Sequence, residues 1–456
     1  MKAVPSELLA GWAHTLRRCG ERPALTDAAT GATTSFRALE AAAEAEAERF
    51  AAAFGPVRGR LVVFARPNGA AWFAALLAVR KLGGLAVALE PGGPPAHAQA
   101  LAGRLGAAGL VLGDACERLP GRRRFARPGL CLLKLTSGST GGPRALAFTD
   151  AEMLADGRQI AATMGIRSLD TNYALLPFGH SYGLGNLVFP LLAQGTAAVC
   201  GTVPLPHVVA GEIRAFHPTV WPTVPAVLRA LAASEVPADA LAPLRLVISA
   251  GSFLPPEVAR DFHARFGRTV HNFYGSSETG GIAYDRGGAA TLSGRAVGRP
   301  LRGVRLRLAP GGRVAVTSAA AFSLGNRRGP GQVLLADHGR LESRGELVLL
   351  GRAGRFAKIA GRRIGFGEVE LALRALEGVE QVFVTALPGP EPILAAAVQS
   401  ARPAAELRAA LQLRLPHWKV PKRLVCWPLF PLTPRGKPDP AALTAGLGRR
   451  RDQLPA

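Results

Sequence analysis

The chain is poor in cysteine and in acidic residues, and it lacks long apolar runs. Its five cysteines are far apart and never in Cys-x-x-Cys spacing, which argues against a disulfide framework or a zinc site. Charges at Arg66, Arg80 and Lys81 interrupt the best apolar stretch, so none reaches the ~20 residues of a membrane span. Residues 1–7 lead into a polar amphipathic stretch and not into an apolar signal core. We therefore expect a cytoplasmic protein without a membrane span.

The shortage of acidic residues leaves the chain strongly basic. There are 55 Lys and Arg against 32 Asp and Glu, a formal charge of +23, and only seven of the basic residues are lysine. Arginine is spread along the whole chain, and the denser runs at 122–124, 362–363 and 449–451 are typical of solvated surfaces. We therefore expect no specific nucleic acid partner. A basic nucleic-acid-binding protein without enzymatic activity is the alternative from a different class.

The length and apolar content predict a compact protein with more than one domain. With 456 residues, of which 48% are hydrophobic, the usual ~100 to 200 residues per domain suggest two or three units. Helical patterns at 38–54 and 68–82 alternate with short apolar runs at 60–65 and 84–89, which predicts a parallel α/β sheet. Similar runs return at 219–223, 244–249 and 269–273. Ligands bind beyond the carboxyl ends of such strands, so chemistry is expected there.

The hydrophobic pattern changes in the last third of the chain. Residues 292–350 alternate apolar and polar side chains with many glycines, which predicts antiparallel β structure. A helical pattern at 369–376 and strand-like runs at 381–385 and 393–398 follow a Gly/Arg-rich stretch. We predict an α/β protein with a large N-terminal domain, residues 1–351, that has parallel sheets and a β-rich, barrel-like part. A small, mobile α+β domain, residues 352–456, follows it.

The segment Leu135–Arg144 reads Leu-Thr-Ser-Gly-Ser-Thr-Gly-Gly-Pro-Arg and follows a strand-like run. Glycines let backbone N–H groups approach phosphate oxygens, hydroxyls add donors, and a terminal cation offsets charge. The segment is not a Walker loop, because the Gly-Lys-Ser/Thr ending is missing. By itself it is equally well explained as a flexible Ser/Gly turn.

Further segments follow in order along the chain. They are Leu-Pro-Phe-Gly-His-Ser-Tyr-Gly-Leu at 176–184, Leu-Arg-Leu-Val-Ile-Ser-Ala-Gly-Ser at 244–252, Asn-Phe-Tyr-Gly-Ser-Ser-Glu at 272–278, Asp-His-Gly-Arg-Leu at 337–341, Gly-Arg at 351–352, Gly-Arg-Arg-Ile at 361–364 and Pro-Leu-Thr-Pro-Arg-Gly-Lys at 431–437. Together with the Ser/Gly segment, this set resembles the ANL superfamily of adenylate-forming enzymes, which includes acyl- and aryl-CoA synthetases, peptide synthetase adenylation domains and luciferases. The resemblance spans nearly the whole chain, and the joint pattern is highly specific.

The resemblance implies a role for each matching residue. The ATP phosphates would be bound by Thr136, Ser137, Gly138, Ser139, Thr140, Gly141 and Arg144, and the nucleotide would also contact Gly251, Ser252, Asn272 (adenine amino group), Tyr274 (base stacking), Gly275, Ser276, Ser277, Asp337 (ribose) and Arg352. Glu278 would face the phosphates and bind Mg²⁺, and Thr136, Glu278 and Lys437 would be catalytic. His180, Ser249 and Gly280 would border the pocket for the carboxylate substrate.

Taken singly, most of these residues have ordinary explanations. Glu278 alone is a solvated acid, Asp337 a turn residue and Lys437 a surface lysine, and a histidine beside apolar residues, such as His180, usually fills a packing position. Their order along the chain is what favours function. Lys437 also lies between turn-forming residues, which would hold it at a defined place.

Some positions depart from the family pattern. Arg144 replaces the usual lysine, Ser277 replaces threonine, and only Asp337 remains of the Thr-Gly-Asp signature. Gly354 stands at the expected hinge, where most relatives carry Asp or Lys, so domain rotation remains feasible but less constrained.

The resemblance implies activation of a carboxylic acid by ATP and Mg²⁺ and then transfer to a thiol. Residues 175–187 contain no acid that could pair with a substrate ammonium group, which favours a simple fatty or aromatic acid. The thiol acceptor is either CoA, with Arg355, Arg362 and Arg363 near its phosphates, or a phosphopantetheinyl group on an acyl carrier protein, whose acidic surface would be attracted to the same arginines.

Overall fold

The computed structural model describes residues 6–121, 123–136, 144–323, 330–352, 356–359, 362–387, 392–415, 417–433 and 438–448; for residues 136, 144, 352, 356–359, 362 and 363 it describes the backbone alone. The chain forms two compact units, Met1–Leu306 with Val316–Val333, and Arg307–Ala315 with Leu334–Ala456. Each unit is described by itself below. The domain boundary expected after residue 351 stays a prediction.

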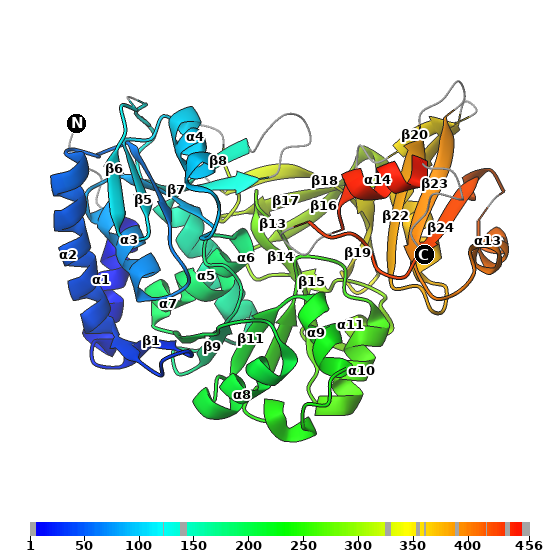
Figure 1. Ribbon diagram of the computed structural model, residues 1–456, viewed down its shortest axis with the longest axis horizontal. Helices are drawn as coiled ribbons and strands as arrows, with labels where there is room; N and C mark the ends of the chain where they lie inside the picture. Colours follow the sequence, from blue (N-terminus) through cyan, green and yellow to red (C-terminus); the bar gives the residue numbers. More distant parts are fainter. Residues whose placement is uncertain are drawn as a thin grey trace. The chain divides into compact units, whose positions relative to one another are not determined.

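The first sheet of unit 1 has six strands in the order β6-β5-β3-β4-β7-β8. Strands β3 to β5 and β7 are parallel neighbours, whereas β6 and β8 add antiparallel edges. The bounds are β3 Leu61–Ala65, β4 Leu85–Leu89, β5 Gly109–Leu112, β6 Ala115–Arg118, β7 Leu130–Thr136 and β8 Arg144–Thr149, with helices α1 Glu7–Cys19, α2 Phe36–Phe54, α3 Ala70–Lys81, α4 Pro95–Leu105 and α5 Asp150–Met164. Helices α2 and α3, labelled in Figure 1, and strands β3 and β4 confirm the predicted alternation.

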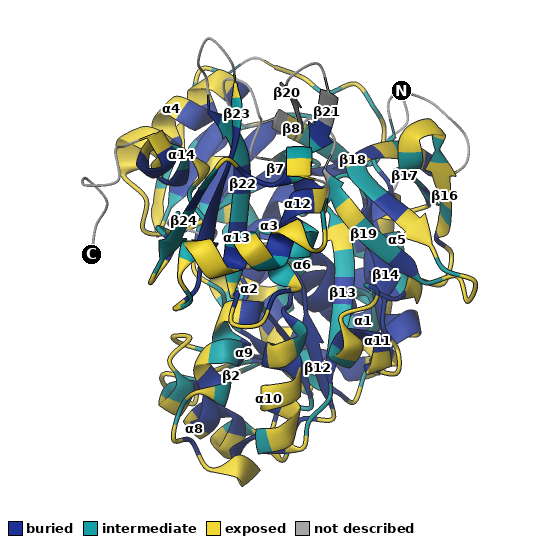
Figure 2. Cartoon of the chain, turned by 90° about the vertical axis from the view of Figure 1, so that its right-hand side faces the viewer, coloured by how far each residue is buried: buried dark blue, intermediate teal, exposed yellow. Residues whose placement is uncertain are grey.

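The second sheet of unit 1 has nine strands in the order β15-β14-β13-β12-β11-β9-β10-β1-β2. The strands are β1 Pro23–Asp27, β2 Thr33–Ser35, β9 Thr171–Ala174, β10 Ala197–Cys200, β11 Val220–Thr223, β12 Leu246–Ser249, β13 Val270–Ser276, β14 Gly280–Tyr284 and β15 Arg299–Pro300. The helices between them are α6 Ser181–Gly183, a π-helical turn Leu184–Val188, α7 Phe189–Gln194, α8 Pro206–Phe216, α9 Pro225–Ala232, α10 Pro256–Phe266 and α11 Ala289–Ser293. Strands β1 and β9 to β13 are parallel neighbours. Figure 2 shows the exposed outer faces of α8 and α10 (yellow) and buried residues in strands such as β12.

The β-rich and C-terminal parts also follow the predicted class. A four-stranded sheet, β16-β17-β18-β19, contains the points where the chain passes between the units, and unit 2 adds a two-stranded and a three-stranded sheet, β20-β21 and β22-β23-β24. The bounds are β16 Arg305–Ala309, β17 Arg313–Ser318, β18 Gly331–Leu341, β19 Leu347–Arg352, β20 Phe356–Ile359, β21 Arg362–Gly365, α12 Phe366–Arg374, β22 Gln381–Leu387, β23 Ile393–Gln399, α13 Ala404–Gln412, β24 Arg423–Trp427 and α14 Pro440–Gly448. The expectation of an α/β protein with parallel sheets and a β-rich part is confirmed.

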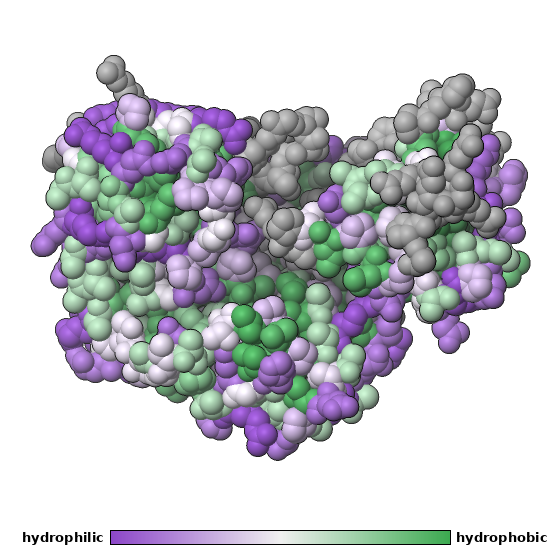
Figure 3. Space-filling model, in the orientation of Figure 1, coloured by the Kyte–Doolittle hydropathy of each residue, from purple (hydrophilic) through white to green (hydrophobic). Residues whose placement is uncertain are grey.

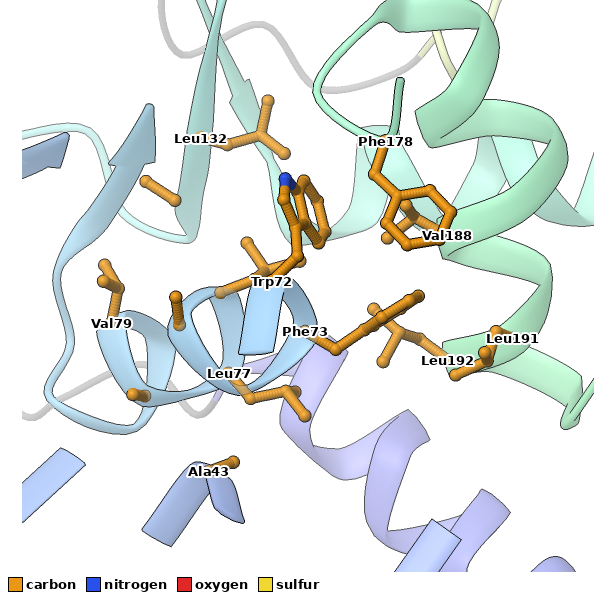
Figure 4. Close-up of a cluster of buried hydrophobic side chains, with 14 of the residues drawn as sticks. Ala43, Trp72, Phe73, Leu77, Val79, Leu132, Phe178, Val188, Leu191 and Leu192 are labelled. Atoms are coloured by element: carbon orange, nitrogen blue, oxygen red, sulfur yellow. The ribbon is translucent and has the colours of Figure 1, made fainter. Parts of the chain in front are cut away.

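Aromatic side chains form the centre of the largest core cluster. Trp72 of α3 is 2% exposed, and its ring centroid lies 5.5 Å from that of Phe64 and 5.4 Å from that of Phe178. Phe73 and Phe178 lie 5.2 Å apart in a near-perpendicular arrangement, which aromatic pairs favour. Figure 4 shows Trp72, Phe73 and Phe178 converging with Val188, Leu191 and Leu192. The core thus joins α3 to the chain segment that leads into His180.

All five cysteines are free, and Cys19, Cys131 and Cys200 are buried. Burial raises the pKa of Cys200 to about 12 and raises the pKa of Cys131 well above its usual value. At pH 8 only about 1 in 10,000 Cys200 thiols is then a thiolate, the form that alkylating reagents attack. We expect Cys131 and Cys200 to react with iodoacetamide only after unfolding, as peptide mass spectrometry would show. Rapid labelling of either thiol in the native protein would contradict this packing.

Among the described residues, no helix combines the length and apolar character needed to cross a bilayer. In Figure 3, hydrophilic residues gather over the upper left of the view, where β6 and α4 lie in Figure 1.

Candidate functional site

Three neighbouring strands carry polar residues at the point where their parallel pairing ends, and β13 continues beyond it to Ser276. Thr223 of β11 is in register with Ser249 of β12, which is in register with Asn272 of β13. Thr223 is buried, and Ser249 is fully buried, with no hydrogen-bond partner for its hydroxyl in the described part of the chain. Gly251 follows with φ of 87°, a value that glycine adopts easily, and turns the chain away from the strand. The structure therefore brings the predicted residues Ser249, Gly251 and Asn272 to one sheet edge.

The predicted nucleotide segment continues into a hairpin of β13 and β14. Tyr274 and Ser276 lie on β13, and residues 277–279 form the turn, which places Glu278 half-buried at its tip. Two hydrogen bonds hold the turn. The Thr279 and Ser276 hydroxyls lie 3.0 Å apart, and Phe322 N–H, from outside the hairpin, donates to the Glu278 carbonyl at 2.7 Å. Gly275 and Gly280 also lie in this hairpin. Glu278 thus lies on a turn that hydrogen bonds hold in place.

His180 lies at the start of α6 and faces a carboxylate that the sequence analysis missed. Its Nε2 contacts Glu90 Oε1, and both side chains are partly exposed. Glu90 follows β4 directly, so its position at the end of a predicted strand was the available signal. The acid that residues 175–187 lack is therefore supplied by a neighbouring strand, although this one is already paired with His180.

Two further contacts hold the His180 segment in place. Asn68 donates to the Leu176 carbonyl at 2.8 Å and accepts from Phe178 N–H at 2.9 Å. The Tyr182 hydroxyl donates to the Ile248 carbonyl of β12 at 3.1 Å, and burial raises the pKa of this tyrosine well above its usual value. The segment is therefore tied both to the chain before α3 and to the strand that ends at Ser249.

The expected phosphate loop connects two paired strands. Thr136 at the end of β7 is in register with Arg144 at the start of β8, so the backbone returns on itself across the loop. Ser137, Gly138, Ser139, Thr140 and Gly141 lie outside the described residues, and so do the side chains of Thr136 and Arg144.

In unit 2, two predicted ribose-binding positions face each other across a strand pair. Asp337 of β18 is in register with Arg352 of β19. Lys437, the hinge residue Gly354 and Arg355 lie outside the described residues. Their roles stay predictions.

A basic pocket opens in unit 1 beside β7 and β8. It has a volume of about 320 Å³, and its lining includes Arg123, Arg124 and Arg127 together with apolar side chains such as Phe125 and Phe322. Arg127 is bonded to Ser323 and Glu152, whereas Arg123 lies over the Phe125 ring. The lining of the pocket therefore combines positively charged and apolar side chains.

The residues around Glu278 fit a magnesium ion that is carried by phosphates. In the described part of the chain, no three His, Cys, Asp or Glu side chains gather into a metal cage. Mg²⁺ in nucleotide enzymes is typically bound by one or two carboxylates together with substrate phosphates and water. A single carboxylate on a hydrogen-bonded turn matches that donor set.

Comparison with known proteins agrees with this geometry. The family model of AMP-binding enzymes matches residues 12–128 and 124–316. Benzoate–CoA ligase of Thauera aromatica is 28% identical over 56% of this chain and 52% of its own length. Sulfoacetate–CoA ligase of Cupriavidus necator is 29% identical over 67% of this chain and 65% of its own length. A probable nonribosomal peptide synthetase of Salinispora arenicola, CymA, is 30% identical over 69% of this chain and 4% of its own length. The chain thus spans about half the length of the benzoate ligase and less than two thirds of the other two.

Solved structures share the fold. ATP-bound MatB from Rhodopseudomonas palustris superposes with a TM-score of 0.82 at 19% identity, covering 97% of this chain and 99% of that one. NpsA from Klebsiella oxytoca gives a TM-score of 0.81 at 19% identity, covering 98% and 100%. The family model covers more than half of the chain, so this protein belongs to the AMP-binding enzymes and thereby to the ANL superfamily of adenylate-forming enzymes.

Proposed function

We propose that the chain activates a carboxylic acid with ATP to an acyl-adenylate and then transfers the acyl group to CoA. A carboxylate oxygen attacks the α-phosphorus, and the bond to pyrophosphate breaks. The thiol sulfur then attacks the acyl carbonyl, its proton passes to solvent, and AMP leaves. The observation that carries the proposal is that Thr223, Ser249 and Asn272 lie in register on three neighbouring strands. The AMP-binding family model matches the part of the chain that contains them.

The chain contributes mainly position and charge to such a transfer. Asn272 and Tyr274 would orient the adenine, Ser276 and Ser277 would contact the phosphates, and Glu278 would hold Mg²⁺. When bound, the ion would neutralise charge that develops on the phosphates. Lys437 would place its ammonium group between the substrate carboxylate and the α-phosphate.

For the acid substrate, we propose a simple fatty or aromatic acid. Among the described residues, Glu90 contacts the predicted pocket wall, and its Oε1 is already paired with His180. Two CoA ligases among the relatives, benzoate–CoA ligase and anthranilate–CoA ligase of Pseudomonas aeruginosa, are named for aromatic acids. An aromatic acid is therefore the first class to test.

Replacing Glu90 with glutamine tests the His180 contact. We expect KM for the acid to rise by up to about five-fold with little change in KM for ATP, because partly exposed ion pairs contribute roughly 0.2–1 kcal/mol. Steady-state pyrophosphate release gives both constants, and Glu117→Gln, an exposed acid on β6, is a matched control. A larger effect on ATP than on the acid would contradict the placement of His180 at the acid pocket.

We propose CoA as the acceptor, because a pocket lined by arginines and apolar side chains suits its phosphates and adenine. A carrier-loading ligase is the second candidate, because the chain is 30% identical to part of a probable peptide synthetase. A panel of carboxylic acids assayed for ATP-dependent pyrophosphate release identifies the acid. Adding CoA and measuring the thioester by mass spectrometry then separates the candidates: a thioester supports CoA, whereas acyl-AMP that transfers only to a phosphopantetheinyl carrier supports the second.

A further inference from the structure

Lys134 is a cation buried in the interior of unit 1. It lies on β7, two residues before Thr136, with 3% of its surface exposed. Its Nζ lies 4.2 Å from the centroid of the Phe148 ring, and no oxygen of the described residues accepts its N–H groups. A buried ammonium group is unfavourable unless opposite charge compensates it, so the surrounding charges decide its role.

Three carboxylates act on Lys134 electrostatically. Burial lowers the pKa of its ammonium group, and Asp156, Glu152 and Glu278 act in the opposite direction. Glu152 is already bonded to Arg127, Ser323 and the Thr149 amide at the start of α5. Asp156 and Glu278 are therefore the remaining carboxylates whose charge favours the ammonium form of Lys134.

Asp156, on α5, is 1% exposed and is hydrogen-bonded to the β13–β14 hairpin that carries Glu278. Its Oδ1 accepts the Gly281 N–H at 2.9 Å, whereas its Oδ2 has no hydrogen-bond partner within the described ranges. Gly280 has φ of 69°, and a Cβ there would lie 2.1 Å from Asp156 Oδ1. The carboxylate thus touches the backbone directly after the turn that carries Glu278.

We infer that Lys134 and Asp156 form a positioning pair that fixes the Glu278 turn relative to the strand leading into the predicted phosphate loop. The inference rests on the proposed function, in which these two elements hold the phosphates and the metal. Asp156 holds the turn through Gly281, and the charge of Lys134 offsets the repulsion between the carboxylates of Asp156 and Glu278. Neither residue touches the substrate, and the pair acts through Glu278.

The test is the double variant Lys134→Met/Asp156→Asn, which removes both charges and keeps an amide oxygen for Gly281. We expect the Mg²⁺ concentration for half-maximal pyrophosphate exchange to rise about ten-fold, the lower range for residues that support metal ligands. KM for the acid should stay unchanged. The matched control is Asp170→Asn, another buried carboxylate of unit 1, which is paired with Arg245; it should lower the melting temperature without moving the Mg²⁺ dependence.

A double variant with wild-type Mg²⁺ dependence would overturn the inference, whatever its melting temperature. If the double variant does not fold, Asp156→Asn alone takes the same titration with the same two outcomes. If the wild-type protein shows no pyrophosphate exchange with any acid of the panel, the proposed function fails. Calorimetric measurement of MgATP binding then tests the Lys134–Asp156 pair independently of that function. About ten-fold weaker binding by the variant supports the pair, and equal binding overturns it.

Discussion

Replacing Lys437 with alanine is expected to lower acid-dependent pyrophosphate exchange by about 100-fold or more, comparable to the loss of a preorganised charge-stabilising donor. The physical reason is that negative charge moves onto the leaving pyrophosphate as the carboxylate attacks, and a positioned ammonium group stabilises that change more than it stabilises bound ATP. We therefore expect kcat to fall while KM for ATP changes little.

Lys422→Ala is the matched control, because this lysine of unit 2 is exposed and has no role in the proposed site. It should retain the wild-type exchange rate. Near-unchanged exchange by Lys437→Ala in a folded protein would remove Lys437 from the mechanism and leave charge stabilisation to the N-terminal unit.

Trp72→Ala is expected to destabilise unit 1 by about 3–5 kcal/mol, the usual range for removing a fully buried aromatic side chain. The cost combines lost burial with an unfilled cavity between Phe64, Phe73 and Phe178. Since Phe178 lies two residues before His180, KM for the acid should also rise. Chemical denaturation monitored by circular dichroism gives the free energy of unfolding.

Leu169→Ala provides the comparison, because this leucine is 80% exposed and its loss should change the free energy of unfolding by about 0.5 kcal/mol or less. A loss below about 1 kcal/mol for Trp72→Ala would mean that the aromatic cluster repacks without the indole and does not anchor the His180 segment.

The strands and helices predicted from periodicity are those with strong local signals. The apolar run at 61–65 forms a buried strand, and the helix at 36–54 begins two residues before the predicted start and ends where the pattern places its end. Helix α5 was not predicted, although Thr149 and Glu152 form a capping box at its start, a signal that the sequence carries. The sequence therefore carries helix-start signals, such as this capping box, that hydrophobic periodicity alone does not detect.

The candidate site likewise contains residues that local motifs predict and contacts that depend on the fold. Ser249 and Asn272 could be predicted because each lies in a short motif, and neighbouring parallel strands place the two motifs side by side. Glu90 follows a predicted strand, but its contact with His180 could not be predicted, because only the folded chain brings the two together. The same holds for the electrostatic influence of Asp156 on Lys134. The predicted roles of Ser137 to Gly141 and of Lys437 stay predictions.

Acid-dependent exchange of labelled pyrophosphate into ATP tests the central claim most directly, because it reports acyl-adenylate formation and needs no thiol. The account predicts exchange that requires Mg²⁺, saturates with one aromatic or fatty acid from a panel and is lost in Lys437→Ala. Exchange that is absent with every acid, or that proceeds equally without acid, would contradict it.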